Sequence, residues 1–475
     1  MGASEHGARW AQAAAGALAG ASDVPLWLDT PFRPSARPVL LGERRADLCV
    51  VGGGFTGLWC ALRALERGEA DDVVLLEAGR IAGAASGRNG GFVDASLTHG
   101  LDNGVAHFPD EIAELVRLGR RNLDGIEQTV RAERIDCGFR RSGGIDVATD
   151  GWHLDALSDS AALARRYGEP VELLDGPAVR GRVSSPTYLG GLYHPDTTAL
   201  VDPARLAWGL AASLERRGAA LHELSPVLQV RREGAGVRLD AERGTVHAGR
   251  AVLATGAFPP LVRRVRRYVL PVYDYVLATE PLDARTLEAL GWPGREGLSD
   301  AGNQFHYYRL TPDDRVLFGG YDAVYYFNNG TGVRREVRPA TFHMLAEHLF
   351  ETFPQLAGVS FTHAWGGAID TCSRFSAFFG KELEGRLAYA AGFTGLGVGA
   401  SRFAADVLVD LVTGATTERT DLRMVRDPPF PIPPEPLRSA VVALTRWSLQ
   451  RADAHEGRRN AWLHLLDRFG VGFAS

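Results

Sequence analysis

Three features of the sequence predict a mixed α/β fold, in which a Rossmann-like domain is interleaved with an antiparallel-sheet domain. An apolar strand, a glycine turn, a helix and a second apolar strand follow one another at 46–78. Two further glycine turns, at 254–256 and 392–399, end an apolar strand and open a helix, respectively. Aromatic-rich segments at 268–325 alternate apolar and polar residues, as strands of an antiparallel sheet do.

The elements can be placed in order along the chain. Residues 26–45 carry three prolines and form an extended arm. The apolar run at 48–51 indicates a strand covered on both faces, and the helix at 55–67 repeats apolar residues at helical spacing. Further helices are expected at 109–135, 152–167, 203–217 and 337–352, the third capped by Asp202 and opened by Pro203. The proline cluster at 427–436 is a linker or clamp that precedes a C-terminal helix.

The chain of 475 residues is long enough for two large substructures. We assign 46–100, 196–265 and 364–425 to the Rossmann-like domain, and 101–195 and 266–363 to the antiparallel-sheet domain. The helix and arm at 1–45 precede them, and the clamp and helix at 426–475 follow.

Composition excludes several classes of function. The net charge of −5 and pI near 6.2 predict neither a nucleic-acid nor an acidic-membrane partner. The four cysteines lack a CxxC pair and a nearby histidine cluster, so we expect no bound metal, no disulfide framework and a cytoplasmic protein. No stretch approaches the roughly 20 apolar residues of a membrane span.

The first glycine turn is the strongest functional signal. It reads G-x-G-x-x-G, as Gly52, Gly54 and Gly57, between a strand and a helix. This pattern brings a pyrophosphate to the backbone and to the positive end of the helix. Glu77 ends the next strand, where its carboxylate suits ribose hydroxyls and disfavours a 2′-phosphate. The turn predicts a dinucleotide site for NAD or FAD, with contacts that include Phe55, Thr56 and Ala78.

A second signal is the loop IAGAASGRNGGF at 81–92, which has no large apolar side chain between its ends. Either it is a solvated turn, or a large anionic group lies against its backbone. A third signal is the helix that begins near 399, because its positive end faces the glycine turn before it.

Together these motifs resemble the glycine/D-amino-acid oxidase superfamily of FAD-dependent amine oxidoreductases. The resemblance spans about residues 25–415, and its pattern is similar above all to the gamma-glutamylputrescine oxidoreductase-like subgroup. Two marks of that subgroup are the WLD arm at 27–29 and the loop at 83–91, which has one extra alanine here. The resemblance implies noncovalent FAD, held through Ala85, Ser86, Arg88, Asn89, Gly90, Gly91, Val227, Thr255, Gly256, Gly395, Leu396, Gly397 and Val398.

The resemblance also implies the reaction. A hydride equivalent passes from the carbon beside an amine nitrogen to flavin N5, leaving an imine that hydrolyses. The substrate would be a small-molecule amine or amino acid, and the electron acceptor O2 or a carrier. Candidate catalytic residues are His306 as a base and Arg309 as a carboxylate ligand, together with Tyr273, Tyr308 and Trp365. Residues of these types are also common as paired or core side chains of a sheet.

Alternatives remain open from the sequence. One is a dehydrogenase of an aminophosphonate, a D-amino acid or a natural-product intermediate, and another is a non-catalytic flavin-binding subunit. Lys381 is the only lysine and falls in an apparent hairpin, so the sequence does not favour an oxidase assisted by lysine. His194 and Asp370 are further candidates for lining the cavity.

Overall fold

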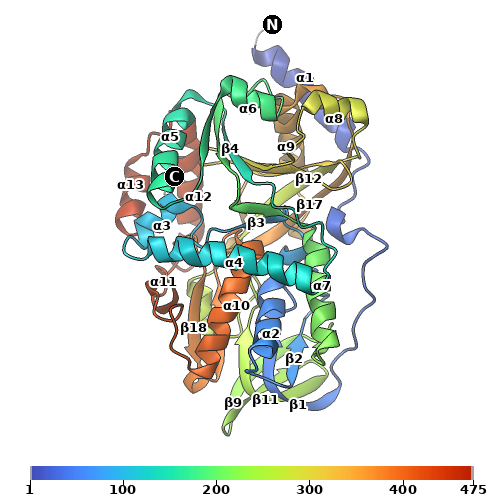
Figure 1. The fold of residues 1–475 in the computed structure, drawn as a ribbon, viewed down its shortest axis with the longest axis vertical. Coiled ribbons are helices and arrows are strands. Elements are labelled where there is room, and N and C mark those ends of the chain that lie inside the picture. The colour runs from blue at the N-terminus through green and yellow to red at the C-terminus, as the bar shows by residue number, and fades with distance from the viewer. Residues whose placement is uncertain (1–2, 472–475) are drawn as a thin grey trace.

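The computed structural model describes residues 3–471, with two sheets stacked along the long axis of the molecule (Figure 1). Residues 1–2 and 472–475, at the ends of the two predicted terminal segments, lie outside the described residues. The mixed α/β fold predicted from the sequence is confirmed, with a Rossmann-like sheet in the lower half and the aromatic-rich sheet in the upper half.

The lower sheet is parallel at its centre. Its main path runs β18 (Phe378–Glu382), β19 (Leu387–Ala391), β11 (Gly244–Leu253), β1 (Gly42–Val51), β2 (Val73–Leu76) and β8 (Ala220–His222). The antiparallel strands β9 (Val227–Glu233) and β10 (Gly236–Ala241) extend it from β11. All four residues of β2 and the last four of β1 are buried, as expected for strands covered on both faces.

Helices cover the lower sheet on the side that faces the viewer in Figure 1. They are α2 (Phe55–Glu66), α7 (Pro203–Arg216) and α10 (Gly397–Thr413), and α4 (Ile112–Ala132) crosses α10 near its start. The predicted start of α7 is confirmed, because the Asp202 carboxylate accepts a hydrogen bond from the Arg205 N–H at 2.9 Å.

The upper sheet is mostly antiparallel. Its path runs β16 (Val324–Tyr325), β12 (Leu270–Thr279), β15 (Val316–Gly320), β14 (His306–Leu310), β13 (Gly297–Asp300), β4 (Gly144–Ala148), β6 (Gly190–His194) and β5 (Glu172–Asp175), and β17 (Phe361–Thr371) pairs with β12. Two details differ from the expectation. The pair β13–β4 is parallel, and β17 crosses the proposed domain boundary at 364. The alternation of apolar and polar residues along a strand does not reveal whether its neighbour runs parallel or antiparallel, which explains why the parallel pair β13–β4 was not expected.

The remaining helices fill the flanks. α1 (Ala3–Leu18) and α9 (Pro339–Thr352) pack together on the upper sheet, where α6 (Gly176–Arg182) and α8 (Ala284–Leu290) also lie. α3 (Leu101–His107) and α5 (Gly151–Arg166) lie at the side, and the short strands β3 (Phe92–Asp94) and β7 (Thr198–Leu200) pair between the two large sheets.

After α11 (Arg423–Arg426) and the proline stretch, the chain ends in two helices instead of the single helix expected, α12 (Leu437–Asp453) and α13 (Ala461–Arg468). Gly457, at φ +74°, lies in the turn between them, and the Asn460 side chain caps α13.

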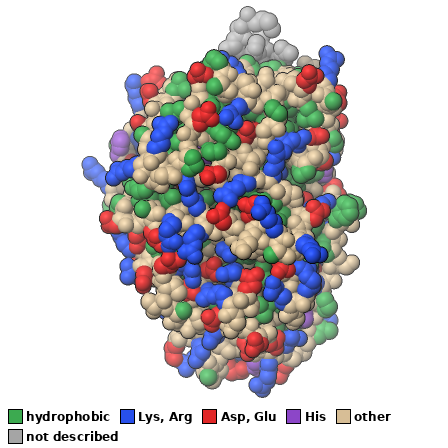
Figure 2. All heavy atoms as spheres, viewed as in Figure 1, with side chains coloured by type: hydrophobic (Ala, Val, Ile, Leu, Met, Phe, Trp, Pro, Cys, Tyr) green, Lys and Arg blue, Asp and Glu red, His purple; other side chains and the backbone are tan. Residues whose placement is uncertain are grey.

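Within residues 3–471, every helix is too short or too polar to cross a bilayer. Basic and acidic side chains are interspersed over the face shown in Figure 2. All four cysteines are buried free thiols.

Candidate active site

A cavity of about 1710 Å³ lies between the two large sheets. Ligand pockets typically enclose about 300–1,000 Å³, so this space is large enough for more than one molecule. At one end it reaches the glycine turn that follows β1, where the parallel strands of the lower sheet end. Open α/β sheets bind ligands at this edge.

The first glycine turn has the close contacts that its pattern predicts. Gly52 has φ +116°, and a Cβ added there would lie 2.3 Å from the carbonyl oxygen of Ala254. A Cβ on Gly57 would lie 1.9 Å from the Gly52 carbonyl oxygen, so only glycine lets α2 pack this closely on the turn. Gly54 lines the cavity, and the N–H of Phe55 donates to Ser86 Oγ at 2.9 Å. The turn and the loop at 81–92 are therefore held together.

Glu77 lies at the same edge. Its carboxylate accepts hydrogen bonds from the N–H groups of Gly53 at 2.6 Å and Gly79 at 2.7 Å, and burial raises its pKa. Its neighbour Ala78 lines the cavity, as do Val227, Thr255 and Gly256 from the adjoining segments.

The loop at 81–92 is fixed from the side that faces away from the cavity. Three side chains donate to its backbone carbonyl oxygens: Trp27 to Asn89 at 2.8 Å, Trp365 to Arg88 at 2.8 Å, and Arg309 to Gly91 at 3.2 Å. Within the loop, the Asn89 amide donates to the carbonyl oxygens of Ala85 and Ser86 and accepts from the Gly91 N–H. The loop is thus a rigid wall of small residues, not a solvated turn.

Arg88 lines the cavity, but its guanidinium is directed to protein partners. It donates to the Gly83 carbonyl oxygen at 2.9 Å and lies 2.9 Å from the Glu336 carboxylate. Its positive charge is therefore largely compensated within the protein.

The glycine turn before α10 opens onto the same cavity. Gly395 has φ +92°, and no atom lies within 4 Å of a Cβ added there. Together with Leu396, Gly397 and Val398 it lines the cavity where α10 begins. The first N–H groups of a helix have no partner within the helix and carry a partial positive charge.

These features fit a dinucleotide with an attached ring system. The starts of α2 and α10, the first glycine turn and the buried carboxylate of Glu77, which suits a ribose, all lie on one cavity. There is no room for a side chain on Gly54, because a Cβ there would lie 2.9 Å from Ser86 Oγ. All of the predicted cofactor residues line the cavity except Gly57 and Gly91, which lie directly behind it.

The structure does not bring four of the five predicted catalytic residues to the cavity. His306 is 8% exposed and bonds Asp300 at 2.5 Å and His348 at 2.9 Å. Tyr308 bonds Tyr188 at 2.8 Å within the core. Arg309 and Trp365 are the buried donors that hold the loop at 81–92. Arg309 therefore binds backbone carbonyl oxygens and not, as expected, the carboxylate of a substrate.

Tyr273 does line the cavity, but its hydroxyl accepts a hydrogen bond from the Gly332 N–H at 2.8 Å and its ring packs against Tyr275 and Tyr326. His194 and Asp370, also considered from the sequence, line the cavity as well.

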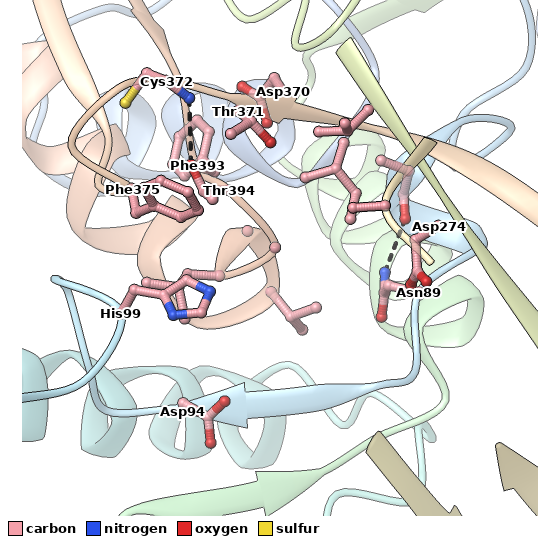
Figure 3. Close-up of a pocket in the computed structure, with 18 of the residues that line it drawn as sticks. Asn89, Asp94, His99, Asp274, Asp370, Thr371, Cys372, Phe375, Phe393 and Thr394 are labelled. Atoms are coloured by element: carbon pink, nitrogen blue, oxygen red, sulfur yellow. Dashed lines mark hydrogen bonds between the residues drawn. The ribbon is translucent and has the colours of Figure 1, made fainter. Parts of the chain in front are cut away.

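Several carboxylates that were not singled out from the sequence enter the cavity from the upper sheet and from the segments beside it. Figure 3 shows Asp274 and Asn89 on one side of the cavity, and Asp94 and His99 on the other. Asp146 and Glu169 line it too. Asp146 is 3.2 Å from His194, and burial raises the pKa values of Asp94 and Glu169.

Asp274 is the most completely held of these carboxylates. It accepts hydrogen bonds from the Tyr307 hydroxyl at 2.6 Å, the Tyr275 N–H at 2.8 Å and the Gly320 N–H at 3.1 Å. Burial nevertheless raises its pKa to about 6. A polar residue between two aromatic ones on a predicted strand is the signal that could have singled it out.

Comparisons with known proteins agree with this site. The family described as FAD dependent oxidoreductase (DAO) matches residues 47–411. Gamma-glutamylputrescine oxidoreductase of Escherichia coli (strain K12) is 34% identical over 82% of this chain and 88% of its own length. An oxidoreductase named OrdL of Rhizobium meliloti (strain 1021) is 30% identical over 84% of this chain and 90% of its own length.

Among solved structures, glycine oxidase from Geobacillus kaustophilus is similar with a TM-score of 0.67, at 23% identity over 79% of this chain and 96% of that one. L-proline dehydrogenase from P. horikoshii also has a TM-score of 0.67, at 17% identity over 81% of this chain and 96% of that one. The family match covers most of the chain and includes all three glycine turns of the cavity. The chain belongs to the DAO family of FAD-dependent oxidoreductases, and FAD is its cofactor.

Proposed function

We propose that this enzyme oxidises the C–N bond of an amine or amino acid to an imine. The observation that carries the proposal is that carboxylates of the upper half of the molecule enter the same cavity as the dinucleotide cradle. Carboxylates attract the cationic form of an amine. The relatives named above include one for gamma-glutamylputrescine and one for glycine, which are both amines.

In this proposal, FAD is held by the residues that the sequence predicts. The glycine turn and the start of α2 would bind the pyrophosphate, Glu77 the ribose, and the loop at 81–92 and the start of α10 the flavin ring. Bound FAD would supply the hydride acceptor, at flavin N5. The protein's own part is to orient the amine, exclude water and manage protons.

Asp274 would hold the amine nitrogen. Its three donors keep it in one orientation. One of them is Tyr307, whose ring packs against Gly90, so Asp274 lies close to the loop proposed to contact the flavin. With a pKa of about 6, it is ionised at neutral pH and could accept a proton from an ammonium group more readily than an exposed carboxylate.

The test is an anaerobic titration of the purified, flavin-containing protein with polyamines, D- and L-amino acids and N-methyl amino acids. Loss of the absorption band near ~450 nm, a property of oxidised flavin, is expected with one of these classes. Admission of air then distinguishes O2 from a carrier as electron acceptor. A protein that keeps its flavin band with every compound would contradict the proposal, and so would a protein without flavin.

The variant Asp274→Asn tests the assignment of the carboxylate. It keeps the shape of the side chain and removes the charge, so we expect the concentration of amine needed for half-maximal bleaching to rise at least tenfold. Unchanged bleaching would refute the role of Asp274 without affecting the proposed reaction.

A further inference from the structure

The C-terminal segment at 427–471, which we call the C-terminal cap, forms part of the cavity wall although it lies beyond the family match, which ends at residue 411. In Figure 1, α12 and α13 of the cap lie beside α5 and α3. Residues of the cap that line the cavity are Phe430, Pro431, Ile432, Pro433, Val441, Val442, Thr445, Arg446, Leu449, Arg459, Trp462, Leu463, Leu466, Phe469 and Val471.

The lining residues follow helical spacing. In α12 they are Val441, Thr445 and Leu449, four residues apart, and in α13 Trp462 and Leu466 have the same separation. Each helix therefore presents one face to the cavity. These five residues are all partly exposed, so their apolar surface is left for a ligand to cover.

The polar side chains on this wall have protein partners, although the buried Nε of Arg446 itself forms no hydrogen bond within residues 3–471. The Arg446 guanidinium forms an ion pair with Asp322, Arg459 forms one with Asp467 at 2.7 Å, and Trp462 Nε1 donates to the Thr445 hydroxyl at 3.0 Å. The wall of the cap is consequently apolar in character. Apolar side chains of α3, α4 and α5 also line the cavity, namely Leu101, Ile112, Leu115, Val116 and Leu157.

The cap is anchored before α12 and at the end of α12. The Ser373 hydroxyl donates to the Phe430 carbonyl oxygen at 2.7 Å, before α12. At the end of α12, the Asp453 carboxylate accepts from the N–H groups of Asn303 at 3.1 Å and Gln304 at 3.0 Å. These anchors join the cap to segments that line the cavity themselves.

From this arrangement we infer that the cap forms a subsite for an apolar substituent on the substrate, such as an alkyl chain or an aryl group at the end away from the reacting nitrogen. The inference rests on the proposed function for the identity of the reacting group. The cap, which lies outside residues 47–411 matched by the family, would then select the part of the substrate that lies away from the reacting nitrogen.

Binding of a homologous series tests this subsite. We would measure dissociation constants of n-alkylamines from butylamine to octylamine for the flavin-loaded protein without oxygen, by calorimetry. Burial of one methylene strengthens binding about fourfold, so affinity should rise by about that factor with each added carbon. If an amine bleaches the flavin, the same constant is taken from the concentration dependence of the bleaching rate.

Two adjacent leucines provide a matched pair of variants. Leu466 lines the cavity, whereas Leu465 is 43% exposed and does not line it. Leu466→Ala should weaken octylamine binding by on the order of tenfold and leave butylamine nearly unchanged, while Leu465→Ala should affect neither. Leu466→Trp should fill the subsite and shorten the longest chain that binds well.

The outcomes separate this inference from the proposed function. Affinity that does not depend on chain length in the unaltered protein overturns the subsite. A dependence that Leu466→Ala and Leu466→Trp leave unchanged overturns the assignment to the cap. Chain-length dependence without bleaching by any amine supports the subsite and contradicts only the proposed function.

Discussion

Replacing Arg309 by methionine distinguishes the role that the structure gives this residue from the one that its sequence context suggests. Its guanidinium donates to the carbonyl oxygens of Val201 at 2.8 Å, Gly91 at 3.2 Å and Gly90 at 3.4 Å. The side chain is only 2% exposed, and burial lowers its pKa to about 10, so it remains charged at neutral pH. Methionine fills similar space but removes this donor; the Gly91 carbonyl oxygen keeps its bond from the Val201 N–H at 2.9 Å, so the carbonyl oxygens of Val201 and Gly90 are the two most affected.

The expected magnitude follows from these contacts. A buried polar group that loses its partner costs about 1–3 kcal/mol. For the two carbonyl oxygens that lose their partner, and with part of the loss offset by removal of a buried charge, we expect the free energy of unfolding to fall by about 3 kcal/mol. For a chain of this size, that corresponds to a Tm lower by roughly 3 °C. Because the loop would lose its fixed shape, FAD should also bind more weakly, by on the order of tenfold.

The assay is a pair of measurements on the variant. Thermal unfolding and FAD dissociation give the structural effect, and kcat/KM with an amino acid and with the corresponding amine gives the substrate effect. We expect both substrates to lose the same factor. A loss confined to the amino acid, with unchanged Tm and FAD affinity, would refute the structural role and restore Arg309 as a ligand of the substrate carboxylate.

Three other predictions concern the pH dependence, the glycine turn and the single lysine. The raised pKa of Asp274, about 6, means that its carboxylate is ionised above that pH, so kcat/KM for an amine should fall about tenfold per pH unit below 6, and a profile that is flat from pH 5 to 8 would contradict its role. Gly57→Ala places a Cβ 1.9 Å from the Gly52 carbonyl oxygen, so the variant should purify without flavin, and normal flavin content would contradict the tight turn. Lys381 is exposed and does not line the cavity, so Lys381→Ala should leave the rate of flavin reoxidation in air within about twofold, as measured by stopped-flow absorbance.

The cofactor side of the site could be predicted from the sequence because its constraints are local. The contacts of Gly52 and Gly57 depend on a turn of a few residues, and the glycines are required wherever that turn occurs. The loop at 81–92 could be recognised as part of the cofactor site for the same reason. It lacks large side chains because it packs against the first glycine turn and lines the cavity. In these turns and loops, the residue types nearly determine the conformation of the backbone.

The substrate side could not be predicted because a strand does not reveal which of its faces meets the cavity. On β14, His306 and Tyr308 share a face, and that face packs into the core beneath α9, where Tyr308 contacts Phe353. The intervening Tyr307 lies on the other face and lines the cavity. On β12, Asp274 lies on the opposite face from Tyr273 and Tyr275 and reaches the cavity, which Tyr273 lines as well. On β14, therefore, a shift of one residue separates the expected cavity residues from the observed one.

The donors behind the loop at 81–92 have a consequence for stability. The loop follows β2 of the lower sheet, but its carbonyl oxygens are held by Arg309 of β14 and Trp365 of β17, both in the upper sheet. The shape of the cofactor cradle therefore depends on the upper sheet being folded. A ligand that binds only the folded state stabilises it by RT ln(1 + [L]/Kd), so FAD should stabilise both sheets together and not the lower one alone. Hydrogen exchange with and without FAD would show this, because amides of β14 and β17 should gain protection along with those of β1 and β2, and protection confined to the lower sheet would mean that the loop does not couple them.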